Sequence, residues 1–136
     1  MSQLPLLCLL ILSTVAVSSA VCLASPFQYM CEIKNVFEVS DEGTLRRYNG
    51  ESAWVGQKIA IDRHTDRVIG RMFDNGTAST IQILDPGSSE QSFKLLSVFK
   101  GAYIQTDFLT VNEYSKTPKN PFVGVRDSTT YSGLCD

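Results

Sequence analysis

The sequence has few of the residues on which catalytic and nucleic-acid-binding sites depend. Among its 136 residues there is one histidine, His64, and charged side chains make up only 19%. The formal net charge is −2, and no segment gathers lysine or arginine into a basic cluster. A strong basic field, which nucleic acids and anionic lipid surfaces require, is therefore excluded, and neither is an expected partner.

Charge is also missing from the N-terminus, where no charged side chain precedes Glu32. Residues 4–12 are almost wholly apolar, and small residues follow up to Ala24. This order predicts a signal peptide over residues 1–24, although its first part carries no Lys or Arg. An uncleaved anchor helix is the alternative, since roughly 20 apolar residues can span a bilayer. After cleavage no membrane span is expected, because later apolar runs are short.

The cysteines help to place the cleavage point. Cleavage after Ala24 leaves Cys31 and Cys135, which can pair, whereas cleavage after Ala20 leaves Cys22 as an odd thiol. The first is favoured, and it predicts an exported protein, periplasmic or secreted, with one disulfide. The closed loop of about 100 residues would contribute about 4–5 kcal/mol in the chain-entropy model.

The remaining residues, 25–136, have the length of a single domain. Short runs of β-branched and aromatic residues alternate with turn residues, and no long stretch shows a helical period. The strands are expected at residues 29–39, 44–48, 58–62, 67–73, 80–84, 92–99, 102–111, 122–126 and 130–134. The pattern predicts an all-β fold, a small antiparallel barrel or sandwich of about 7–8 strands. A short helix is possible at residues 51–56.

Two turn signals stand out. Asn75-Gly76 is the dipeptide most typical of a tight hairpin, and it predicts an exposed tip there. Asn75 also begins the sequence Asn-Gly-Thr, a glycosylation site if the host is eukaryotic. Asp85-Pro86-Gly87-Ser88 predicts a second turn, since Pro presets one dihedral angle and Gly permits the next.

The candidate site lies around His64, between Asp62 and Asp66 in the segment IAIDRHTDRVIG. A metal site is not expected, because there is no second histidine and the two carboxylates fit no calcium-loop pattern. A catalytic His64 would need a nucleophile and an orienting group, and neither is recognisable. The simpler interpretation is a four-residue turn, with Asx-type bonds to an aspartate and weak pairs to the flanking arginines across solvent.

The segment KIAIDRHTDRVIG resembles a hairpin, roughly Phe-x-Val-Asp-Arg-x-Thr-Gly-x-Ile-x-Gly, of uncharacterised small exported proteobacterial proteins. Those proteins also carry an early Cys and a Gly-turn hairpin, as in YMCEIKNVFEVSDEGTL. The resemblance implies export and a β-rich fold, and nothing catalytic. Asp66 stands where that pattern has Gly, so Asp66 is expected in a left-handed turn conformation.

Three functions are compatible with these patterns. The first is a non-enzymatic exported protein that binds another protein or an envelope component. The second is a carrier of a small apolar ligand, with a cavity lined by late aromatic residues: Phe93, Phe99, Tyr103, Phe108 and Tyr114. The third is a hydrolase that uses His64. No cofactor is expected, and no catalytic constellation is present in the sequence, so the binding protein is favoured.

Overall fold

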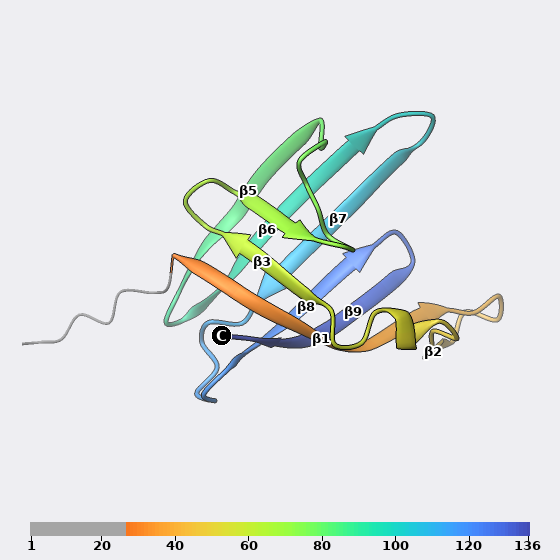
Figure 1. The fold of residues 1–136 in the computed structure, drawn as a ribbon, viewed down its shortest axis with the longest axis horizontal. Coiled ribbons are helices and arrows are strands. Elements are labelled where there is room, and N and C mark those ends of the chain that lie inside the picture. The colour runs from red at the N-terminus through yellow and green to blue at the C-terminus, as the bar shows by residue number, and fades with distance from the viewer. Residues whose placement is uncertain (1–26) are drawn as a thin grey trace, which may run out of the picture.

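The computed structural model describes residues 27–136. These residues form one antiparallel sheet of nine strands that curls into a half-barrel (Figure 1). Eight strands follow the order β4-β3-β1-β9-β8-β7-β6-β5, and β2 pairs with β1 outside that path. The all-β prediction is confirmed, with nine strands rather than seven or eight. The predicted signal peptide, residues 1–24, lies outside the described residues.

The strand bounds agree well with the expected ones. They are β1 Gln28–Val39, β2 Leu45–Arg47, β3 Lys58–Asp62, β4 Arg67–Gly70, β5 Thr80–Ser88, β6 Gln91–Lys100, β7 Ile104–Val111, β8 Asn120–Arg126 and β9 Thr129–Cys135. A single 3₁₀ turn, η1 Glu51–Ala53, occupies the place where a short helix was possible. No helix among residues 27–136 is long and apolar enough to cross a membrane.

The core lies on the concave face of the curled sheet. Alternate residues of each strand point inward, as the two-residue period of a strand requires. On β3 these are Ile59 and Ile61, and both are fully buried as expected. They belong to the same buried cluster as Phe93 of β6 and Leu109 of β7. The two wings of the sheet therefore pack on each other across one core.

The first and last strands pair in the middle of the sheet, and the disulfide Cys31–Cys135 joins them there. The two cysteines are direct partners across the β1–β9 ladder and are separated by 104 residues in the chain. The predicted disulfide is confirmed. It ties the two ends of the described chain at the centre of the sheet.

A β-bulge in β1 was not foreseen. The register against β9 shifts between Ile33 and Asn35, so Lys34 is an extra residue. The buried positions change parity there, from Ile33 to Val36. Lys34 is left on the convex face, on the same side as Glu32. The bulge therefore brings two charged residues of one strand together on the outer surface.

Both turn signals in residues 74–88 were misplaced. Asp85-Pro86-Gly87-Ser88 is part of β5, which bends at a register shift between Ile83 and Asp85, and the chain turns only after Ser88. Asn75-Gly76 does not join paired strands, because β4 and β5 lie at opposite ends of the strand order. Turn chemistry therefore marked a bend within β5 and a loop after β4, and neither is the hairpin turn that it predicted.

Candidate functional site

The turn that holds His64 has the predicted geometry. Residues 63–66 form a four-residue turn between β3 and β4, and Asp66 has a left-handed φ of 59°. Oδ1 of Asp62 accepts hydrogen bonds from the backbone N–H of His64 at 2.8 Å and of Thr65 at 3.2 Å. These two bonds lower the pKa of Asp62. His64 is exposed, as expected for a turn.

The flanking arginines form ion pairs with carboxylates other than Asp62 and Asp66. Arg63 turns inward, where its Nη1 lies 3.0 Å from Oε1 of Glu113. Arg67 contacts Asp74 and Asn75 instead, each at 2.9 Å. These ion pairs of both arginines therefore lead away from His64, whereas Asp62 stays bonded to the turn.

Glu113 is the most unusual acid in the described structure. It follows β7, its side chain is 6% exposed, and the hydroxyl of Tyr29 donates a hydrogen bond to its Oε1. Its other oxygen, Oε2, is buried with no hydrogen-bond partner. Burial raises the pKa of Glu113 to about 7.

Arg63 joins three parts of the curled sheet. From the β3–β4 turn it donates to the carbonyl of Pro86 in β5 and pairs with Glu113 after β7. Its guanidinium also lies 5.5 Å from the ring centroids of both Tyr29 and Phe93. Burial lowers the pKa of Arg63. These contacts hold the wings of the half-barrel together, so the structure assigns this cluster a part in closing the fold.

Gly87 allows Glu113 to occupy this place. It has a left-handed φ of 76°, and a Cβ added to it would lie 2.6 Å from Oε2 of Glu113. Any side chain at position 87 would therefore press on the buried carboxylate. The two residues were not connected by any sequence pattern, because β5 and β7 are not neighbours in the sheet.

Asn75 is buried, at 2% exposure, so the expectation of an exposed tip is wrong. Its Oδ1 accepts from the N–H of Val68 at 2.8 Å, and its Nδ2 donates to the carbonyl of Asp66 at 2.7 Å. The nitrogen that glycosylation would modify is thus engaged in the folded protein. Asn75 therefore pairs with the outward-facing backbone of Val68 on β4.

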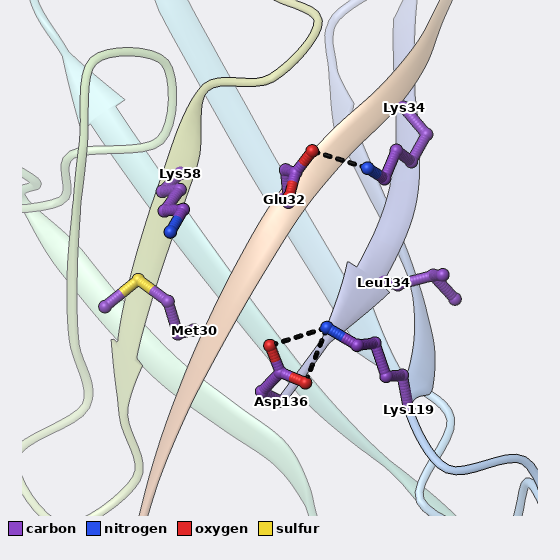
Figure 2. A pocket seen from close by; sticks show the side chains of 7 residues that line it. All are labelled: Met30, Glu32, Lys34, Lys58, Lys119, Leu134 and Asp136. Carbon is purple, nitrogen blue, oxygen red and sulfur yellow. Dashed lines mark hydrogen bonds and ion pairs between the residues drawn. The ribbon is translucent and has the colours of Figure 1, made fainter.

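A surface pocket lies on the convex face of the sheet and contains side chains of both charges (Figure 2). Its volume is about 130 Å³, and its lining residues are Met30, Glu32, Lys34, Lys58, Lys119, Leu134 and Asp136. We call it the lysine pocket. Its position follows from register, because Glu32 of β1 pairs with Lys58 of β3 on one side and Leu134 of β9 on the other.

The charges of the lysine pocket are unequally matched. Lys34 pairs with Glu32 at 2.5 Å, and Lys119 pairs with Asp136 at 2.8 Å. Within residues 27–136, Lys58 has no ion-paired or hydrogen-bonded partner. The hydrogen bond and charge of Lys34 lower the pKa of Glu32, and Lys58 and Lys119 add to the effect. The lining side chains therefore comprise three lysines and two carboxylates.

An apolar hollow adjoins the lysine pocket. It is lined by Thr117, Pro118, Lys119, Pro121 and Leu134, and its volume is about 420 Å³. Lys119 and Leu134 line both, so the two depressions are adjacent. Pro121 pairs with Leu134 across β8 and β9, which explains their position on the same face. No sequence pattern predicted this surface, because its residues come from four strands and a loop.

The five late aromatic residues do not surround one cavity. Phe93 is fully buried in the core, whereas Tyr103 and Tyr114 are 71% and 51% exposed. Among residues 27–136, no three His, Cys, Asp or Glu side chains are grouped so that they could hold a metal ion. Comparisons with protein-family models, with curated proteins and with solved structures found no match.

Proposed function

We propose that this chain is an exported binding protein, periplasmic or secreted, whose partner is another protein of that compartment. The disulfide supports export, because such bonds persist in oxidising compartments. The N-terminal sequence supports it independently, with its apolar run, small residues and late first charge.

One observation supports the binding role: the lysine pocket adjoins the apolar hollow, and Lys119 and Leu134 line both. Binding surfaces commonly combine an apolar contact with a few polar groups that fix orientation. Here the apolar part is Pro118, Pro121 and Leu134, and Lys58 supplies a cation without an ion-pair partner in the described residues. A partner segment with an acidic side chain beside an apolar one fits this surface by charge and by shape.

The test compares two variants with the same change in charge. Lys58→Glu alters the lysine pocket, and Lys100→Glu alters an exposed residue outside it. The tagged proteins are used to recover partners from envelope or secreted extracts, and the recovered partner is then purified and titrated against each. Lys58→Glu should weaken binding at least tenfold, which is about 1.4 kcal/mol. Lys100→Glu should bind as the unmodified protein does.

Equal binding by the two variants would show that the lysine pocket is not the contact surface. Repeated recovery of no partner at all by the unmodified protein would count against the binding role itself.

A further inference from the structure

A half-barrel has free edges, and the described sheet has three, at β4, β5 and β2. A free edge exposes backbone N–H and C=O groups that can pair with another chain, so proteins generally cover or blunt it. The outer edge of β4, a strand of four residues, is partly covered, since Asn75 bonds to the N–H and C=O of Val68. The edge at β2 is only three residues long.

The edge at β5 is protected along only half of its length. Its second half carries the register shift after Ile83, the charge of Asp85, and Pro86, whose carbonyl accepts from Arg63. Its first half, residues 80–84, has no charge, no proline and no glycine. Within the described residues its backbone has no hydrogen-bonded neighbour other than β6.

Residues 80–84, with the sequence TIQIL, are also suited to pair with themselves. In an antiparallel pair centred on Gln82, that residue faces its own copy, and Ile81 of one chain faces Ile83 of the other. β-Branched pairs of this kind stabilise neighbouring strands. A two-fold axis produces such self-pairing automatically, because each chain presents the same edge. Thr80, Ile81, Gln82 and Leu84 are exposed and accessible.

We infer that a second copy of this chain pairs with β5 along residues 80–84, antiparallel and about a two-fold axis at Gln82. The two curled sheets then continue into each other across the dimer. This surface is separate from the lysine pocket, which is built from β1, β3, β9 and the loop before β8. The inference therefore does not depend on the proposed binding function.

Gln82 gives a sharp test, because a charge placed there meets its own copy. Sedimentation velocity of the purified protein should show a dimer, and Gln82→Lys should raise its dissociation constant at least tenfold through repulsion at the axis. Gln82→Glu should do the same, while an equimolar mixture of the two variants should restore the dimer. Gln82→Thr, a neutral strand-forming residue, is the control and should remain dimeric.

A protein that stays monomeric at all concentrations up to about 1 mM would overturn the inference. So would a dimer that both charged variants leave unchanged, since its contact would lie elsewhere. Circular dichroism of each variant checks that the fold is retained. Should Gln82→Lys fail to fold, the mixed-charge experiment is repeated at Thr80 and Leu84, which face each other across the same axis.

Discussion

Two ion pairs, one in the middle of β7 and one just after it, are built in different ways. Arg126 of β8 faces Asp107 of β7 directly across the ladder and binds it with two bonds, at 2.7 and 2.5 Å. Arg63 reaches Glu113 from the other wing of the sheet, and Oε2 of Glu113 has no donor. Both carboxylate oxygens therefore have a donor in the pair that strand register positions. One carboxylate oxygen lacks a donor in the pair that the curling of the sheet brings together.

The difference lies in which constraint positions the two partners. Neighbouring strands place Asp107 and Arg126 at a fixed separation, so the planar guanidinium can meet both carboxylate oxygens. No ladder links Arg63 and Glu113. Their separation instead depends on how the curled sheet places the β3–β4 turn against the end of β7. Burial of the Glu113 carboxylate raises its pKa to about 7. Glu113 can therefore take up a proton, which lowers the cost of burying its charge.

The largest effect is expected from Arg126→Met. It leaves Asp107, whose side chain is 4% exposed, without its cation. Removing one member of a buried pair typically costs about 3–5 kcal/mol. Urea unfolding at pH 7 measures the loss, and the double variant Arg126→Met/Asp107→Leu should recover most of it. A loss below about 1 kcal/mol would mean that this pair is no stronger than a surface pair.

Arg63→Met should cost less, about 2–3 kcal/mol at pH 8, because Glu113 can escape the unpaired charge by protonation. The cost should shrink at pH 5, where the buried carboxyl is neutral without its partner. Unfolding measured at both pH values tests this difference. An equal loss at pH 5 and pH 8 would indicate that Arg63 acts through its ring and backbone contacts alone.

Gly87→Ala should destabilise the protein by about 2 kcal/mol. A left-handed backbone costs an L-residue about 1–2 kcal/mol, and the new Cβ also presses on Glu113. In the Glu113→Ala background that contact is removed, so the penalty should fall to the backbone cost alone. A double-mutant cycle by thermal unfolding separates the two contributions, and zero coupling would disprove the contact.

The smallest change at pH 7, below about 1 kcal/mol, is expected for Glu113→Gln, which removes a titrating group but keeps its shape. The folded pKa of about 7 lies above the ordinary value of 4.5. Between these values the folded protein binds more protons than the unfolded one, so the Glu113 contribution is greatest at low pH and is lost as pH rises through 7. The free energy of unfolding should therefore fall between pH 4.5 and 7 in the unmodified protein, and the Glu113→Gln variant should lack this slope. If the variant kept the same slope, other titrating groups would be its cause.

Much of the fold was predictable because it depends on local patterns. The strand bounds followed from β-branched and aromatic runs, and the turn at His64 followed from the Asp62 side chain and the tolerance of Asp66 for a left-handed φ. The disulfide followed from counting cysteines. The strands and the turn were inferred from residues close together in the chain. The disulfide was inferred because cleavage after Ala24 would leave only two cysteines to pair.

The Arg63 cluster was missed, although a signal for it was present. The inward positions of β3 are Ile59 and Ile61, and the same two-residue period continued once more gives Arg63. On β7, Leu109 and Val111 are inward, and the period extends to Glu113. Carrying the alternation past each strand end would have marked both charges as inward, though not as partners.

Asn75 and the bend of β5 show what the local patterns could not supply. Asn-Gly and Pro-Gly specify backbone dihedral angles that suit several settings, and the packing of distant strands selects among them. Asn75 is buried and bonds to the backbone of β4. Gly87 has no side chain, which leaves room for the carboxylate of Glu113. Local dihedral preference amounts to about 1 kcal/mol, which burial of neighbouring side chains readily outweighs.

By itself, the sequence determined an all-β domain with one disulfide, the strands on either side of His64, and the inward faces of those strands. These features depend on alternation and short-range turn chemistry, which are written along the chain. Only the tertiary structure decided how far the sheet curls, which charges it buries, and which edge it leaves free. Those outcomes depend on residues such as Arg63 and Glu113, whose meeting across 50 residues of chain requires the curled sheet that they then help to hold closed.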